Sequence, residues 1–181
     1  MTPPADRQEP ADSDWIRELL QRHERPLILY AARLLGDVER ARDVVQETFL
    51  RLCNQDRDAL EERADVWLFT VCRNLCHDVH RKESRMTTLE DDSAGSAVAP
   101  VASPAASAES KDDFAHLMEK IELLPPKQQE VLRLKFQHGL SYKEISRITQ
   151  DSIGNVGWLL HTALKGLRER LATSEIRGAE A

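Results

Sequence analysis

Apolar residues recur at helical spacing in two separate groups of segments, which predicts two helical modules. In the N-terminal group, the segments cover about residues 14–35, 38–52 and 64–85. Pro26 is expected to kink or interrupt the first segment, because proline lacks the N–H that an interior helix position needs. Gly36 should end that segment. Asp37 is a good N-cap for the next.

The second group of apolar segments, within residues 123–171, predicts three helices, the last two joined by a tight turn. Ser141 can cap the first helix of this pair, and Glu144 completes a capping box. The turn runs through residues 150–152, and the next helix begins near Ile153. Two short helices with a polar turn form the helix-turn-helix plan, in which the second helix enters the DNA major groove. This module is therefore expected to bind DNA.

The stretch between the two groups is rich in Ala, Ser, Pro and acidic residues and has too little bulky apolar surface to fold. No window shows sustained period-two alternation, so the predicted fold class is all-α, with two small helical domains joined by a flexible linker. The expected boundaries are a disordered tail at 1–13, a helical domain at 14–86, the linker at 87–112, a second helical domain at 113–172 and a disordered tail at 173–181.

The net charge of −6 is unevenly distributed. Residues 1–86 carry 14 basic and 17 acidic groups, residues 87–113 carry 1 and 6, and residues 114–181 carry 10 and 8. The helix-turn-helix end is thus mildly basic. This small excess of basic groups is low for a free-standing DNA-binding protein, whose affinity depends on neutralising phosphates. A protein that binds DNA as part of a larger basic complex tolerates this balance.

The chain is expected to be cytoplasmic. No apolar run approaches the roughly 20 residues that span a bilayer, so we expect no membrane insertion. The polar, acidic N-terminus does not have the pattern of a signal peptide. With three cysteines in a cytoplasmic protein, structural disulfides are not expected.

Two polar constellations stand out in the N-terminal module. Asp43, Gln46 and their neighbours at spacings of three and four share one helix face, which is either a binding surface or a solvated face beside the core. Further on, Trp67 and Phe69 precede a run of polar residues at 73–81. Exposed aromatic residues beside such groups suit single-stranded DNA, on which bases stack. Alternatively, Trp67 belongs to the core and the polar run is a ladder of surface ion pairs.

The order of these segments is informative. Along the chain, the segments occur in this order: DVVQETFLR, a polar loop, WLFxxxRNLxxDxxR, the linker, and LPPKQQEVLRLKFxxGLSYKEI with a helix-turn-helix. This arrangement closely resembles the extracytoplasmic function (ECF) class of bacterial RNA polymerase sigma factors. The resemblance implies a sigma region 2, which binds core polymerase and melts the −10 element, and a sigma region 4, which reads the −35 element. It also implies an anti-sigma factor that covers the polymerase-binding surfaces.

The resemblance also assigns residues to each role. The clamp helices of the largest polymerase subunit would be bound by Asp43, Val44, Gln46, Glu47, Phe49 and Leu50. The melted −10 strand would be held by the loop at 54–63 and by Arg51, Trp67, Thr70, Arg73, Asn74 and Asp78. Region 4 would dock on the flap of the second-largest subunit and contact −35 DNA through Lys135, Lys143, Asn155, Trp158, His161, Lys165 and Arg168. The acidic linker would thread towards the polymerase active-site channel.

The second helix of the helix-turn-helix departs from the usual family pattern, in which arginines and lysines are frequent. This chain instead places apolar or small residues there, among them Gly157, Trp158, Leu159 and Thr162. Asn155 can pair with adenine, and Trp158 can contact a thymine methyl group. Alternatively, Trp158 and Leu159 pack against another protein. The hypothesis is that −35 binding is weak or uses apolar contacts, or that this helix also binds a regulator.

Two other functions compete with the sigma-factor interpretation. The C-terminal segment also resembles the output domain of LuxR-type response regulators, which suggests a stand-alone transcription regulator. Cys72, Cys76 and His80 share a helix stripe, which suggests a zinc or thiol sensor. No metal or other cofactor is expected, since free cysteines are commonly buried as small hydrophobic residues. No arrangement typical of an enzyme active site stands out.

Overall fold

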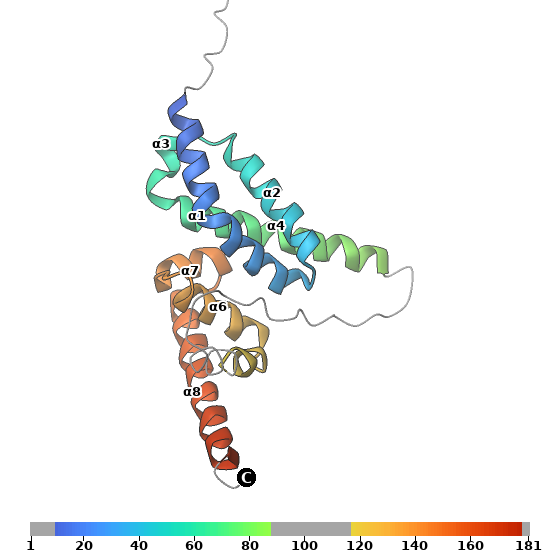
Figure 1. Cartoon of the computed structure of the whole chain (residues 1–181), viewed down its shortest axis with the longest axis vertical. Helices are drawn as coiled ribbons and strands as arrows, with labels where there is room; N and C mark the ends of the chain where they lie inside the picture. Colours follow the sequence, from blue (N-terminus) through green and yellow to red (C-terminus); the bar gives the residue numbers. More distant parts are fainter. Residues whose placement is uncertain (1–9, 88–116, 179–181) are drawn as a thin grey trace, which may run out of the picture. The chain divides into compact units, whose positions relative to one another are not determined.

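In the computed structural model, two compact helical units divide near residue 98, and residues 10–87 and 117–178 are described (Figure 1). All regular elements in these two ranges are helical, which confirms the predicted all-α class with two helical domains. Helix extends from Pro10 and reaches Gly178, so it enters both ranges that were expected to be disordered tails. Most of the predicted linker lies outside the described residues.

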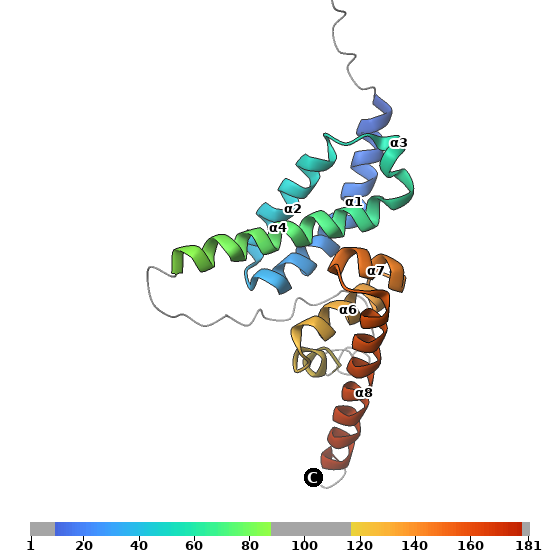
Figure 2. The same cartoon turned by 180° about the vertical axis from the view of Figure 1, so that it is seen from behind.

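The N-terminal unit is built on three long helices. Along the chain, its elements are α1 (Pro10–Leu35), α2 (Val38–Leu52), α3 (Arg57–Leu60), the 3-10 helix η1 (Glu61–Arg63) and α4 (Ala64–Thr87). Figures 1 and 2 show α1 and α2 side by side in opposite directions, with α4 crossing them. The tight reversal between α1 and α2 uses Gly36, whose φ of 73° suits glycine, and Asp37, whose carboxylate caps α2 as predicted.

The core of this unit is formed where α1, α2 and α4 face one another. Leu27 and Ala31 from α1, Leu52 from α2 and Leu68 from α4 are each fully buried. The Tyr30 and Phe69 rings meet edge-on in the same core. The buried Thr48 hydroxyl donates a 2.8 Å hydrogen bond to the carbonyl oxygen of Val44.

Pro26 does not interrupt α1, so of the predicted kink or interruption the interruption is wrong. The helix is continuous from Pro10 to Leu35 with Pro26 inside it. Proline removes one backbone hydrogen bond, but Leu27, Tyr30 and Ala31 immediately after it are all buried. Tertiary packing on α2 and α4 therefore holds the helix together where local preference would break it.

The polar loop predicted at 54–63 is also partly helical, since it contains α3 and η1. Leu60 at the end of α3 is buried and anchors the segment to the core. The guanidinium of Arg57 lies 5.9 Å from the ring centroid of Trp15, which ties α3 to α1 by a cation–π contact. The segment is thus an ordered connection.

The C-terminal unit comprises helical residues 117–122 followed by α6 (Pro126–Phe136), α7 (Tyr142–Thr149) and α8 (Ile153–Gly178). Figure 2 shows α6 and α7 against the N-terminal half of α8. The inward residues of α8 follow the predicted spacing and are buried; they are Val156, Leu160, Ala163 and Leu167. Ile145 and Ile148 from α7 meet this stripe and complete the core.

Candidate functional site

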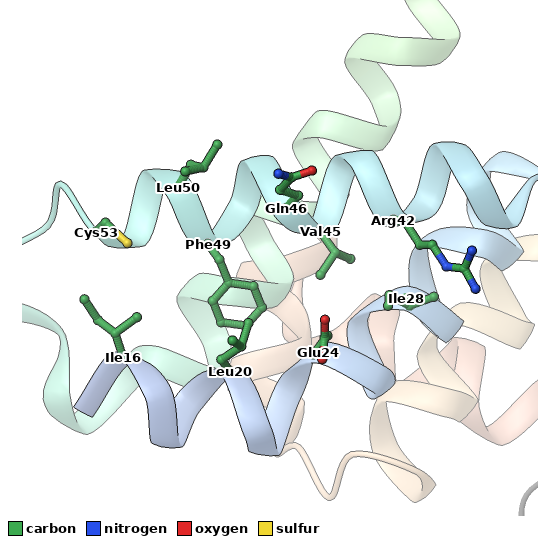
Figure 3. Close-up of a pocket in the computed structure, with 10 residues that line it drawn as sticks. All are labelled: Ile16, Leu20, Glu24, Ile28, Arg42, Val45, Gln46, Phe49, Leu50 and Cys53. Carbon is green, nitrogen blue, oxygen red and sulfur yellow. The ribbon is translucent and has the colours of Figure 1, made fainter. Parts of the chain in front are cut away.

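A groove of about 440 Å³ lies between α1 and α2 of the N-terminal unit (Figure 3). The α1 wall consists of Ile16, Leu20, Glu24 and Ile28. The α2 wall consists of Arg42, Val45, Gln46, Phe49, Leu50 and Cys53. Figure 3 shows Phe49 reaching towards Leu20, whereas Gln46 and Leu50 project away from α1. The lining is mostly apolar, and its charged members are Glu24 and Arg42.

The residues assigned to polymerase binding divide into an exposed set, a buried set and the half-buried Glu47. Asp43, Gln46 and Leu50 are exposed on the outer face of α2, and Leu50 is 54% exposed. Val44 and Phe49 are buried, 6% and 7% exposed, and hold α2 in place. A partner can therefore touch the exposed set directly, while the buried set positions it.

The α1 wall of the groove was not predicted as part of a site. Ile16, Leu20 and Ile28 recur at helical spacing, and a stripe of this kind is usually assigned to the core. Leu20 is nevertheless 36% exposed. Only the packing of α1 against α2 reveals that this stripe extends past the core and onto the surface.

Five of the six predicted −10 residues lie on α4, and four of these form a stripe along it. Trp67, Thr70, Asn74 and Asp78 follow one another at spacings of three or four, so helical geometry places them on one side. Asn74 is exposed, with Arg73 next to it half-buried. The Thr70 hydroxyl donates to the carbonyl oxygen of Val66 at 2.6 Å, which leaves its lone pairs as acceptors.

The two remaining charged members of the predicted −10 set are in ion pairs. Asp78 accepts a 2.7 Å hydrogen bond from Arg81, and this pair matches one rung of the surface ladder considered as an alternative. Arg51 belongs to α2, where its Nε donates to Glu47 at 2.8 Å. Both pairs are solvent-exposed, where ion pairs are weak and exchange readily for other partners.

The expectation of two exposed aromatic residues beside these groups is wrong for Phe69. Phe69 is 2% exposed, and its ring meets Tyr30 edge-on at a centroid distance of 5.3 Å. Successive residues of a helix point about 100° apart, so Phe69 and Trp67 occupy different faces. Trp67 is half-buried and keeps part of its ring accessible beside Thr70.

The helix-turn-helix has the predicted capping box. Ser141 and Glu144 exchange hydrogen bonds between side chain and backbone at the start of α7. These bonds from Ser141 lower the pKa of the Glu144 carboxyl below its usual value. The turn itself passes through Gln150, whose φ of 60° and ψ of 21° are left-handed. The boundaries Thr149 and Ile153 agree with the prediction.

Hydrogen bonds between side chains and backbone lock the turn. The Ser146 hydroxyl donates to the Asp151 carbonyl oxygen at 2.6 Å, and the Ser152 hydroxyl accepts from the Asn155 backbone N–H at 3.1 Å. The Asn155 amide donates to the Asp151 carboxylate at 2.9 Å, and Lys127 approaches the same carboxylate oxygen at 3.5 Å. This network fixes the start of α8 relative to α7.

The predicted −35 residues accordingly fall into two groups. Those exposed on the surface are Lys143, Trp158, His161, Lys165 and Arg168, with Trp158 60% exposed. The other two are used inside the unit. Asn155 belongs to the turn network, and Lys135 donates to the Leu140 carbonyl oxygen at 3.2 Å and lies 5.7 Å from the Tyr142 ring centroid.

The cysteine stripe on α4 is structural in character. Cys72 and Cys76 are completely buried, and a hydrogen bond between their thiols together with burial raises the pKa of Cys72 above its usual value. His80 is exposed, and its Nε2 lies 2.7 Å from the carbonyl oxygen of Leu34. Within residues 10–87 and 117–178, no group of three side chains has metal-binding geometry.

None of the helices in the described part of the chain is both long and apolar enough to cross a membrane.

Comparison with known families and proteins agrees with this geometry. The Sigma-70 region 2 family matches residues 19–86, and the Sigma-70 region 4 family matches residues 115–167. The two matches fall in different structural units and together cover more than half of the chain. The region 2 match accounts for the N-terminal module, which a stand-alone LuxR-type regulator or a thiol sensor leaves unexplained.

Whole-chain relatives show the same order of regions. The ECF RNA polymerase sigma factor SigM of Bacillus subtilis is 32% identical over 164 residues, covering 90% of this chain and 96% of its own. SigL of Mycobacterium tuberculosis is 30% identical over 163 residues, and the match covers 87% of this chain and 89% of SigL. Among solved structures, the chain superposes on the sigma factor RpoE of Bartonella quintana, which was solved in complex with the anti-sigma factor NepR. The TM-score is 0.70 at 25% identity, and the match covers 88% of this chain and 97% of RpoE. The chain therefore belongs to the ECF class of RNA polymerase sigma factors, which are transcription initiation factors.

Proposed function

We propose that this sigma factor binds core RNA polymerase through the outer face of α2 and the groove beside it. The observation that carries the proposal is the exposed pair Gln46 and Leu50, which projects from α2 at the rim of an apolar groove. An apolar side chain next to an amide suits a protein partner, because protein interfaces combine apolar burial with a few directed hydrogen bonds. The partner surface is the pair of clamp helices in the largest subunit.

The stripe on α4 would then hold the melted −10 strand. Asn74 has an exposed amide that can donate to and accept from a base edge, and the accessible part of Trp67 offers a surface for stacking. Region 4 would dock on the flap of the second-largest subunit and present α8 to the −35 duplex. Two weak DNA contacts gain by effective concentration once both are anchored on polymerase. The factor would act in the cytoplasm and supply no enzymatic active site of its own.

Run-off transcription with purified bacterial core polymerase tests the proposal, using the promoter upstream of the gene for this protein. The double variant Gln46→Ala/Leu50→Ala should lose both co-elution with core polymerase and the transcript. Arg73→Ala/Asn74→Ala should still co-elute but give no permanganate-reactive thymines in the −10 region. Each variant is the control for the other. If both variants lose both co-elution and promoter opening, or if neither variant loses either, the proposed separation of polymerase binding on α2 from strand opening on α4 is wrong.

An anti-sigma factor is proposed to cover the same α1–α2 surface. Support comes from the Bartonella quintana RpoE structure, which contains an anti-sigma factor. An inhibitory protein of this kind should compete with core polymerase, and Leu50→Ala should weaken both complexes. An inhibitor that binds together with core polymerase in one ternary complex contradicts this assignment.

A further inference from the structure

The start of α8 presents an outward surface that is almost free of hydrogen-bonding side chains. Val156, Leu159 and Leu160 point into the core of the unit, whereas Ile153, Gly154 and Trp158 are exposed; Ile153 is 51% exposed and Trp158 60%. In a helix-turn-helix, the N-terminal residues of the second helix lie against base edges in the major groove. Here those residues offer apolar groups and bare backbone.

The polar residues nearby form hydrogen bonds within the turn. The amide of Asn155 donates to Asp151 at 2.9 Å, and the hydroxyl of Ser152 accepts from the Asn155 backbone. His161, the next exposed polar residue along α8, comes almost one turn after Trp158. The apolar group that a base pair shows in the major groove is the C5-methyl of thymine. Apolar contact with thymine is therefore the direct readout that the exposed Ile153 and Trp158 can make.

The glycines beside Trp158 are not required by packing within region 4. A Cβ added at Gly154 would meet nothing within 4 Å. At Gly157 it would make an ordinary contact of 3.7 Å with the Tyr142 ring. Glycine destabilises a helix relative to alanine, and it is favoured where a backbone must come close to a ligand. Two glycines that packing does not require thus leave the backbone of this surface open to close approach by a partner.

The charges around this surface favour DNA as that partner. Lys143 and Arg147 on α7 and Lys165 and Arg168 on α8 are exposed. The acidic groups of α7 and the turn accept hydrogen bonds from their own unit, Glu144 in the capping box and Asp151 in the turn, and the exposed Glu169 of α8 lies beyond Arg168. Basic groups flanking an apolar strip can contact phosphates on either side of a groove.

We propose that Trp158, with Gly154 and Gly157 beside it, reads thymine methyl groups in the major groove of the −35 element. Contact with the indole ring selects A·T pairs in which the methyl group faces the helix, and the bare backbone lets α8 lie deep enough for this contact. This inference rests on the proposed role of region 4 and names the feature of the duplex that it recognises.

The test uses holoenzyme assembled from the full chain and bacterial core polymerase. Holoenzyme first selects binding sites from a randomised duplex library, and each thymine of the selected −35 element is then replaced by deoxyuridine, which lacks only the C5-methyl. At one or more positions, wild-type affinity should fall by about fourfold, the loss expected for one buried methyl group. Trp158→Ala should bind thymine and deoxyuridine duplexes equally, while His161→Ala should retain the discrimination.

The glycine variants separate a role in DNA binding from a role in folding, because the two roles predict different combinations of thermal stability and promoter affinity. Gly154→Ala and Gly157→Ala should raise the thermal midpoint of the free chain and yet weaken promoter binding. Equal wild-type affinity for thymine and deoxyuridine duplexes overturns the proposal. So does unchanged discrimination by Trp158→Ala, which would show that the indole does not read the methyl group. Failure of the chain to co-elute with core polymerase overturns the proposed function itself, and with it this inference.

Discussion

The side-chain amide of Asn155 donates a 2.9 Å hydrogen bond to the carboxylate of Asp151 across the turn of the helix-turn-helix. This bond uses one of the two amide N–H groups of Asn155 and holds the amide against Asp151, so we expect Asn155 to support the position of α8. Asp151 in turn receives Lys127 at 3.5 Å, which links the turn to the first residues of α6.

Asn155→Ala should therefore destabilise region 4 by about 1 kcal/mol, the usual net contribution of one hydrogen bond. The bases preferred in the −35 element should not change. Asp151→Ala should show a similar loss, and the double variant should lose less than the sum, since the two residues share one bond. Hydrogen exchange of α7 and α8 amides measures the stability. An Asn155→Ala variant with normal exchange and an altered base preference contradicts this role.

Gln150→Gly should stabilise the same turn. Gln150 has a φ of 60°, and this left-handed conformation costs a residue with a Cβ about 1 to 2 kcal/mol. Glycine removes this cost but gains freedom in the unfolded chain, which offsets about 0.4 to 1 kcal/mol. Slower hydrogen exchange in α7 and α8 is the expected result. Gln150→Val is the opposing control and should accelerate exchange, because β-branched residues tolerate this conformation poorly. Faster exchange in Gln150→Gly argues against a strained turn.

The three cysteines should differ sharply in reactivity. Cys53 is exposed at the end of α2, whereas Cys72 and Cys76 are buried, and the pKa of Cys72 is raised, which disfavours the reactive thiolate. N-ethylmaleimide should add rapidly to one site in the native protein and to all three after denaturation, as read by mass spectrometry. Cys53→Ser should abolish the rapid adduct. Rapid native labelling of Cys72 or Cys76 would support the thiol-sensor alternative.

Features set by local chemistry could be predicted from the sequence. The capping box of Ser141 and Glu144 and the N-cap at Asp37 depend on residues three or fewer positions apart, and both are present. The turn boundaries were also predicted correctly, since polar residues there interrupt the apolar spacing on either side.

Features set by tertiary packing could not be predicted in the same way. Pro26 has a strong local tendency to break a helix, and only the burial of its neighbours against α2 and α4 overrides it. The polar loop becomes helical at α3 because Leu60 is buried in the core. The α1 wall of the groove likewise depends on how far α1 overlaps α2. Asn155 looked available for base pairing because its partner, Asp151, is identified only by the folded turn.

The stability of region 2 should depend on the protonation of His23. This residue of α1 is 7% exposed, and its Nε2 lies 2.9 Å from the carboxylate of Asp65 at the start of α4. Burial lowers the pKa of His23 below its usual value of about 6.5, and the charge of Arg22 lowers it further, whereas Asp65 partly restores it.

Because the unfolded chain takes up this proton at a higher pH than the folded one, acid favours unfolding. The stability contributed by neutral His23 is complete above about pH 6.5 and is lost as the pH falls through the folded pKa. His23→Gln should flatten this dependence. Asp65→Asn should steepen it, since it removes the carboxylate that raises the pKa. Urea midpoints followed by Trp15 and Trp67 fluorescence in a Trp158→Phe background report on region 2 alone. Equal slopes below pH 6.5 for His23→Gln and its parent would exclude His23 as the group responsible.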